Sequence, residues 1–111
     1  MEKILLVGKT SVSAESVVYM KADSNYSDVY LEDGQILTLS KTLKELESMF
    51  EPYGFFRTHK SFLINPKHVV SSSVYEPKPN VRLSNNHCVD ISRRRKNDFL
   101  QVRRKIKAGQ I

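Results

Sequence analysis

The segment 93–107 carries eight Lys and Arg side chains against a single acid, Asp98. The remaining 96 residues hold 10 basic and 11 acidic groups, so the positive charge is concentrated near one end of the sequence. A localised positive charge suits a polyanionic partner, because each phosphate that Lys or Arg neutralises releases condensed counterions. The charge pattern therefore favours nucleic acid as the partner, with an anionic membrane surface as the second choice.

The same basic segment has the pattern of an amphipathic helix. Ser92 is a good N-cap residue, and three apolar residues follow it at helical spacing: Phe99, Val102 and Ile106. A helix from about residue 93 to residue 106 would place three arginines in its first turn, where cations oppose the helix macrodipole. This placement favours contact of the arginines with an external anion such as phosphate. The alternative is a basic tail that only improves solubility.

A second candidate segment, residues 55–65, interleaves bulky apolar residues with Arg, His, Lys and Asn. One face of a strand–turn–strand unit can bury Phe56, Phe62 and Ile64 while the other side chains present donors to phosphate oxygens and base edges. We expect Lys60 to make such a contact. For His59, a core histidine bonded to the backbone is favoured over a ligand contact.

Other chemistry finds little support in the sequence. The residues His59, His68, His87 and Cys88 lack the spacing of a structural zinc site, and Cys88 is predicted to be a small core or half-buried residue in a strand. There is no Gly-rich phosphate loop, and the carboxylates fit helix caps and solvated faces better than acid–base pairs. We therefore expect no enzymatic activity, no bound metal and no cofactor.

Length and composition favour a single domain. The chain has 111 residues, enough for one modest core, and it contains no apolar run of 18 residues that could cross a membrane. Its first nine residues make a poor secretion signal, and one cysteine suits a reducing compartment, so a cytoplasmic protein is expected.

Most of the chain reads as short strands separated by turns. Asp33-Gly34 predicts a hairpin with a type I′ turn, and a second hairpin is expected at residues 84–87. Two prolines make residues 76–80 a turn or an edge excursion. One helix is expected after Thr42, where Thr42 and Glu45 fit a capping box and Pro52 ends the element. The predicted strands are residues 16–22, 26–31, 35–39, 56–57, 62–64, 69–74, 81–83 and 88–91. This spacing predicts an all-β meander.

Four blocks of the sequence, in unbroken order over residues 12–103, carry a family resemblance. They are Asn25-Tyr26-Ser27 with Leu31-Glu32-Asp33-Gly34, then residues 42–47, then Phe56-Arg57-Thr58-His59-Lys60-Ser61-Phe62-Leu63-Ile64-Asn65, and finally residues 89–96. The chain resembles the LytTR family, the DNA-binding output domains of bacterial response regulators.

The resemblance implies a mostly β fold of elongated antiparallel sheets with one or two short helices, which binds promoter DNA as a transcriptional regulator. Loops would enter successive major grooves, and a homodimer or paired domains would read direct repeats. The corresponding loop contacts in this chain are the turn at 25–27, Lys60 and Arg93. The predicted DNA-binding residues are Asn25, Tyr26, Ser27, His59, Lys60, Ser61, Arg93, Arg94, Arg95 and Lys96.

The predicted organisation is an N-terminal extension or first strand at residues 1–11, the LytTR-type domain at 12–107 and a tail at 108–111. LytTR domains usually follow a receiver domain or a membrane segment, so this chain is either a stand-alone regulator or a fragment, with a separate sensor or receiver protein as a further partner. The alternative function is nonspecific binding of RNA or a membrane surface through the basic helix.

Overall fold

The computed structural model describes residues 3–107 and residue 109, which form ten strands and two α-helices. Every strand pair is antiparallel, so the predicted mostly β fold is confirmed. Residues 1–2 of the predicted extension and residues 108 and 110–111 of the predicted tail lie outside the described part. None of the described helices is long and apolar enough to cross a membrane.

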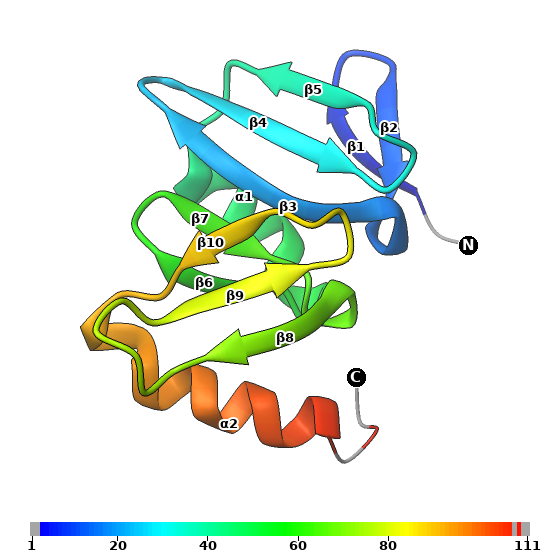
Figure 1. Cartoon of the computed structure of the whole chain (residues 1–111). Helices are drawn as coiled ribbons and strands as arrows, with labels where there is room; N and C mark the ends of the chain where they lie inside the picture. The colour runs from blue at the N-terminus through cyan, green and yellow to red at the C-terminus, as the bar shows by residue number, and fades with distance from the viewer. Residues whose placement is uncertain (1–2, 108, 110–111) are drawn as a thin grey trace.

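A five-stranded sheet in the order β5-β4-β3-β7-β6 forms the centre of the molecule (Figure 1). Its strands are β3 (Val17–Asp23), β4 (Tyr26–Leu31), β5 (Ile36–Leu39), β6 (Phe56–His59) and β7 (Phe62–Ile64). A second sheet has the order β10-β9-β8 and consists of β8 (Val69–Ser73), β9 (Asn80–Leu83) and β10 (Cys88–Asp90). The remaining elements are the hairpin β1 (Lys3–Val7) and β2 (Thr10–Ser13) and the helices α1 (Leu43–Phe50) and α2 (Lys96–Lys107).

Two hydrophobic cores lie on opposite faces of the five-stranded sheet, because neighbouring residues of a strand point to opposite sides. Met20 and Leu63 belong to the core under α1, whereas Ile64 belongs to the core that holds Phe99 of α2. A β-bulge between Val17 and Tyr19 interrupts the alternation in β3. The bulge places the consecutive residues Val18 and Tyr19 in one core, the one that holds Phe99, while Val17 and Met20 belong to the other.

The helix α1 has the predicted capping box. The Thr42 hydroxyl accepts a hydrogen bond from the Glu45 N–H at 3.2 Å, and the Glu45 carboxylate accepts one from the Thr42 N–H at 2.9 Å. On its apolar face Leu43, Leu46 and Phe50 are buried and Met49 is half-buried. The helix ends at Phe50, and a 3₁₀ turn that contains Pro52 follows it, as the sequence predicts.

The hairpin at Asp33-Gly34 is present, but its predicted turn type is wrong. A type I′ turn needs a positive φ at both central residues, whereas Gly34 (φ 93°) has one and Asp33 does not. The Leu31 N–H donates to the Gln35 carbonyl at 2.9 Å, and the Gly34 N–H donates to the Leu31 carbonyl at 3.1 Å. The loop therefore has three residues, with glycine in the left-handed position.

The β9–β10 hairpin repeats this geometry with asparagine in place of glycine. The Leu83 N–H donates to the His87 carbonyl at 2.9 Å, and Asn86 takes the left-handed position with φ 69°. The Asn85 side chain accepts a hydrogen bond from the His87 N–H at 3.1 Å, just as Asp33 accepts one from Gln35 at 2.9 Å. The hairpin predicted at residues 84–87 is therefore present, with an asparagine in the left-handed conformation.

Cys88 is exposed, so its predicted burial is wrong. In β10 only Val89 is buried, and Cys88 shares the solvent face with Asp90. Strand alternation places residues two apart on one face. The position of Asp90 therefore predicts the exposure of Cys88 better than the usual preference of cysteine for the core does.

An aromatic cluster joins the two larger sheets. The ring of Tyr19 in β3 stacks on that of Tyr30 in β4 with centroids 4.4 Å apart, and its hydroxyl lies 2.8 Å from Nδ1 of His87 in the β9–β10 turn. Burial, with Tyr30 nearby, raises the pKa of Tyr19 well above its usual range. This contact fixes the smaller sheet against the central one.

Candidate nucleic-acid interface

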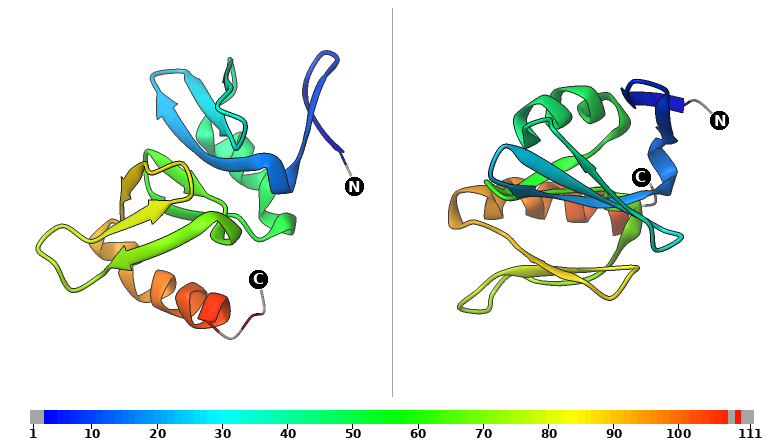
Figure 2. Two further views of the ribbon diagram at one scale, coloured as in Figure 1. Left: turned by 45° about the vertical axis from the view of Figure 1, so that its right-hand side comes forward. Right: turned by 90° about the horizontal axis from the view of Figure 1, so that it is seen from above.

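The three predicted contact regions lie at one edge of the molecule. They are the β3–β4 turn, the β6–β7 turn and the 3₁₀ turn Arg93–Arg95 that precedes α2. In Figure 1 all three lie on the left-hand side, and both views of Figure 2 are consistent with this grouping. Residues more than thirty positions apart in the sequence therefore form one surface.

Strand pairing brings the first two turns together. Antiparallel pairing of β3 with β7 places Lys21 opposite Phe62. Just beyond this pair, the Ala22 N–H donates to the Ser61 carbonyl at 2.9 Å. The β3–β4 turn and the β6–β7 turn must then project from the same end of the sheet.

Two hydrogen bonds attach the third turn to β6. The Ser92 N–H donates to the Thr58 carbonyl at 2.8 Å, and Nε of Arg95 donates to the Arg57 carbonyl at 2.9 Å. The Arg95 guanidinium also lies 4.9 Å from the centroid of the Phe56 ring and 3.3 Å from the Asp98 carboxylate. These contacts hold the start of α2 against the strand that leads to Lys60.

Arg57 braces the β6–β7 turn from within. Its Nε donates to the His59 carbonyl at 3.0 Å, and one terminal nitrogen donates to the Lys60 carbonyl at 2.6 Å. The other terminal nitrogen pairs with Glu47 of α1 at 2.9 Å. The planar guanidinium can serve all three acceptors because its donors point in fixed directions. The turn is thus ordered before any partner arrives.

The turns enclose two shallow clefts that share His59. One, of about 200 Å³, is lined by Glu47, Arg57, His59, Lys60, Arg94 and Arg95. The other, of about 250 Å³, is lined by His59, Pro77, Lys78, Pro79, Asp90, Ile91, Ser92 and Arg93. Cations outnumber carboxylates in both linings, so the surface is suited to a polyanion. Among the described residues, no group of three His, Cys, Asp or Glu side chains could hold a metal ion.

Comparison with known proteins shows the family and the fold of the chain. A family profile described as the LytTr DNA-binding domain matches residues 8–103. The chain belongs to the LytTR family. The structure of a LytTR domain from Bacillus cereus, described as part of a methyl-accepting/DNA response regulator, shares the fold with a TM-score of 0.74 and 20% identity, covering 91% of this chain and 94% of that chain. A search of curated protein sequences gives no significant match.

Most residues of the predicted LytTR contact set are accessible. The exposed members are Asn25, Tyr26, Lys60, Arg93 and Arg94; His59, Ser61, Arg95 and Lys96 are half-buried. Ser27 is fully buried, and its hydroxyl donates to the Lys41 carbonyl at 2.8 Å. Ser27 is in phase with the buried Val29 and Leu31 along β4, so it points inward and cannot reach DNA in this structure.

His59 combines a structural contact with an accessible ring. Its Nδ1 accepts a hydrogen bond from the Ser61 N–H at 3.1 Å, which agrees with the predicted bond to backbone. In the neutral ring the proton must then be on Nε2, which leaves that nitrogen as a donor. Ser61 contributes to the turn through its backbone, since its carbonyl also accepts from Ala22.

The N-terminal part of the basic helix differs from its prediction. Residues 93–95 form a 3₁₀ turn, and α2 begins at Lys96. Ser92 stands at the cap position, but its hydroxyl is buried and has no hydrogen-bond partner among the described residues. Arg93 and Arg94 remain exposed, whereas Arg95 turns toward Phe56.

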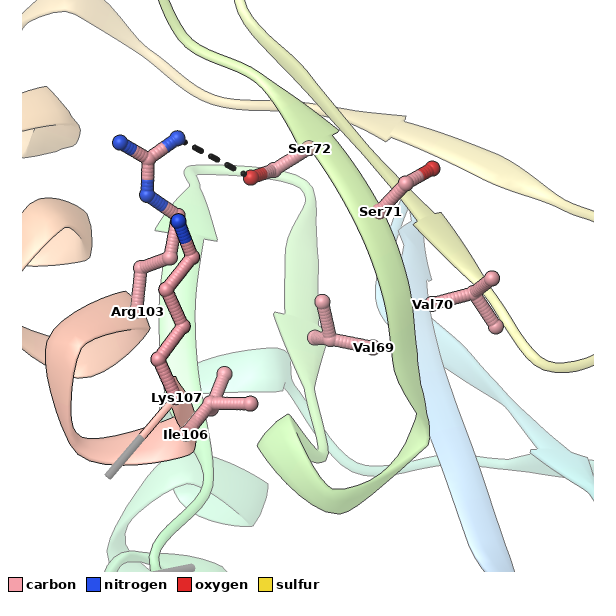
Figure 3. A pocket seen from close by; sticks show the side chains of 7 residues that line it. All are labelled: Val69, Val70, Ser71, Ser72, Arg103, Ile106 and Lys107. Carbon is pink, nitrogen blue, oxygen red and sulfur yellow. Dashed lines mark hydrogen bonds between the residues drawn. The ribbon is translucent and has the colours of Figure 1, made fainter. Parts of the chain in front are cut away.

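The distal half of α2 lies away from this edge. There a cleft of about 300 Å³ separates α2 from β8 and is lined by Val69, Val70, Ser71, Ser72, Arg103, Ile106 and Lys107 (Figure 3). Arg103 reaches back to the Ser72 hydroxyl at 3.5 Å. Its guanidinium therefore lies beside β8.

Two features of the interface were not predicted as parts of a binding site. Arg57 was noted only as one of several donors, although its position two and three residues before the turn carbonyls suits a brace. The segment Glu76–Asn80 was predicted only as a turn or an edge excursion, yet Lys78 lines the same cleft as His59 and Arg93. The flanking prolines of Lys78 were the available signal, since they make a short loop rigid.

Proposed function

We propose that this LytTR domain binds duplex DNA in a sequence-specific manner and acts in transcriptional regulation. The observation that carries the proposal is the assembly of the β3–β4 turn, Lys60 and Arg93 at one basic edge of the fold. Family membership supports DNA as the polyanion. Burial of the strands behind these turns leaves the edge pre-formed, which lowers the entropy lost on binding.

The contacts divide by chemistry. Arg93 is exposed and carries the fork that can bind O6 and N7 of guanine together, so we assign it to base readout in a major groove. Lys60 stands at a turn tip that can enter a groove, while Arg94 and Lys96 suit phosphates. The longest dimension of the domain is 41 Å, comparable with the 34–36 Å of one B-DNA turn. A pair of domains on direct repeats is the arrangement that we propose for the complete complex.

The membrane-surface alternative is disfavoured by the packing of α2. An interfacial helix inserts its apolar face into lipid. Here that face is occupied: Phe99 is fully buried in the core, and Val102 and Ile106 are half-buried. Binding of RNA stays as the competing outcome of the experiment.

A selection from genomic fragments tests the proposal. The purified chain is incubated with the fragments at moderate salt together with an excess of nonspecific duplex, and retained fragments are sequenced and footprinted. We expect a small set of protected sites that share a repeated motif. Loss of every footprint in the presence of competitor would refute sequence-specific recognition. Equal competition by an A-form RNA duplex would instead favour the nonspecific alternative, because shape and charge alone would then explain binding.

A further inference from the structure

The connection between β8 and β9 lies beside the proposed DNA contacts. Lys78 lines the same cleft as His59 and Arg93 and is exposed. Among the described residues its ammonium group makes no ion pair. Figure 1 shows this connection on the same side of the molecule as the other contact loops. Asp90 is the only acid in the cleft lining, against the two cations Lys78 and Arg93.

The backbone around Lys78 is held in place. Pro77 and Pro79 flank it and restrict φ on both sides, and Pro79 is buried. The Asn80 side chain donates to the Lys78 carbonyl at 3.0 Å. The Ile91 N–H donates to the Pro79 carbonyl at 2.8 Å, which ties the connection to the residue two positions before Arg93. Lys78 and Arg93 are therefore positioned relative to each other before binding.

The start of the connection is tied to α2. Lys96 Nζ lies 5.2 Å from the centroid of the Tyr75 ring, and Tyr75 is 79% exposed. A cation above an aromatic face is attracted by the ring quadrupole. Both ends of the connection thus contact the segment that carries the arginines.

We propose that the β8–β9 connection is a fourth DNA-contacting element, in which Lys78 binds a phosphate beside the groove that Arg93 enters. This inference rests on the proposed function and adds a positioning contact to it. A lysine ammonium is a point charge without the planar fork that reads a base, so it suits a backbone oxygen. Rigid attachment to the Arg93 turn would let this phosphate contact set the register of the arginine on the duplex.

The size of the effect follows from counterion release. One phosphate contact on B-DNA contributes about 0.9 to the slope of log affinity against log salt. Lys78→Ala should therefore reduce that slope by about 0.9 and lower affinity about fivefold at 0.15 M salt. The loss of affinity should be the same for cognate and random duplexes. The ratio of wild-type affinity to variant affinity should fall by about 3.5-fold when salt rises from 50 to 200 mM.

Lys67→Ala is the matched control. Lys67 is also an exposed lysine that follows a proline, but it precedes β8 whereas Lys78 follows that strand, so the two lie at opposite ends of β8. Lys67→Ala should keep the wild-type slope. A second variant, Pro77→Ala, keeps every charge; it should lower affinity about two- to fivefold through added freedom of the loop, with an unchanged salt slope.

Three results would overturn the inference while wild-type binding persists. They are an unchanged salt slope for Lys78→Ala, a loss restricted to the cognate sequence, and an equal effect of Lys67→Ala. Failure of the wild-type chain to bind any duplex would instead refute the proposed function, so the two failures are distinguishable.

Discussion

Replacement of Arg57 by alanine should loosen the β6–β7 turn without removing a phosphate contact. Its guanidinium donates to the His59 and Lys60 carbonyls at 3.0 and 2.6 Å and pairs with Glu47 at 2.9 Å. The Arg57 side chain is 20% exposed, so water can replace these bonds only in part. The alanine variant leaves both carbonyls without their charged donor.

The expected loss of stability is about 2–3 kcal/mol. Hydrogen bonds to a charged group contribute about 1.5–3 kcal/mol each when buried, and the bond to Lys60 is discounted because it is exposed. The Glu47 pair adds at most about 1 kcal/mol, since the glutamate is 36% exposed. At about 2.1 cal/mol/K of unfolding entropy per residue, the melting temperature should fall by about 10 °C.

The assay pairs a thermal melt with a DNA titration. We expect Arg57→Ala to lower affinity about tenfold at a temperature where the domain is folded, because the turn that carries Lys60 must then be ordered on binding. The matched control is Glu47→Ala, which removes the ion pair but keeps both carbonyl bonds and should cost less than about 1 kcal/mol. Two results would refute the role of Arg57 in ordering the β6–β7 turn. One is a melting temperature of Arg57→Ala within 2 °C of wild type, and the other is equal destabilisation by Glu47→Ala.

Three further outcomes are expected. Arg93→Ala should cost about 1–3 kcal/mol on a cognate duplex and relax preference at one base position; titration of single-base variants checks this, and a uniform loss on random duplex would remove Arg93 from base readout. Lys60→Ala should leave the melting temperature nearly unchanged and cut DNA affinity several-fold; a lower melting temperature with unaltered affinity would show that Lys60 is structural. His59→Ala should harm folding more than binding, because the Ser61 N–H loses its acceptor. Wild type should lose stability as pH rises above about 10, by about 1.4 kcal/mol per pH unit, because the raised pKa of Tyr19 keeps it protonated in the folded state after the unfolded chain begins to ionise. Tyr19→Phe should lack this pH dependence. The free energy of unfolding is measured by denaturant melts above pH 10, and equal slopes against pH for wild type and Tyr19→Phe would contradict the role of Tyr19.

Some local features were predictable because their causes are local. The capping box of Thr42 and Glu45 depends on four consecutive residues, and the sequence located both it and the end of α1. The hairpin at Asp33-Gly34 was located for the same reason, but its turn type was not. A left-handed glycine fits both a type I′ turn and a three-residue loop, and only the register of β4 with β5 distinguishes them.

Burial of single residues was predictable only where strand phase was used. The residue type of Ser27 predicts a turn position, yet Ser27 is in phase with Val29 and Leu31 and lies in the core. The residue type of Cys88 predicts a core position, yet Cys88 is in phase with Asp90 and is exposed to solvent. In both strands the period of two decides the face, because successive side chains alternate across a sheet.

The sequence by itself located the strands β3 to β10, the two helices, the concentration of cations in residues 93–107 and the family of the chain, but not the hairpin of β1 and β2. Only the tertiary structure decided which of those cations face outward. Pairing of β3 with β7 brings two distant turns to one edge, and the hydrogen bonds of Ser92 and Arg95 to β6 add the third. These contacts join residues more than thirty positions apart, so no local period or cap encodes them. The turn of Arg95 toward Phe56 follows from packing of the start of α2 on β6. Lys78 and Arg93 line one cleft because the β8–β9 connection is bonded to the segment before Arg93.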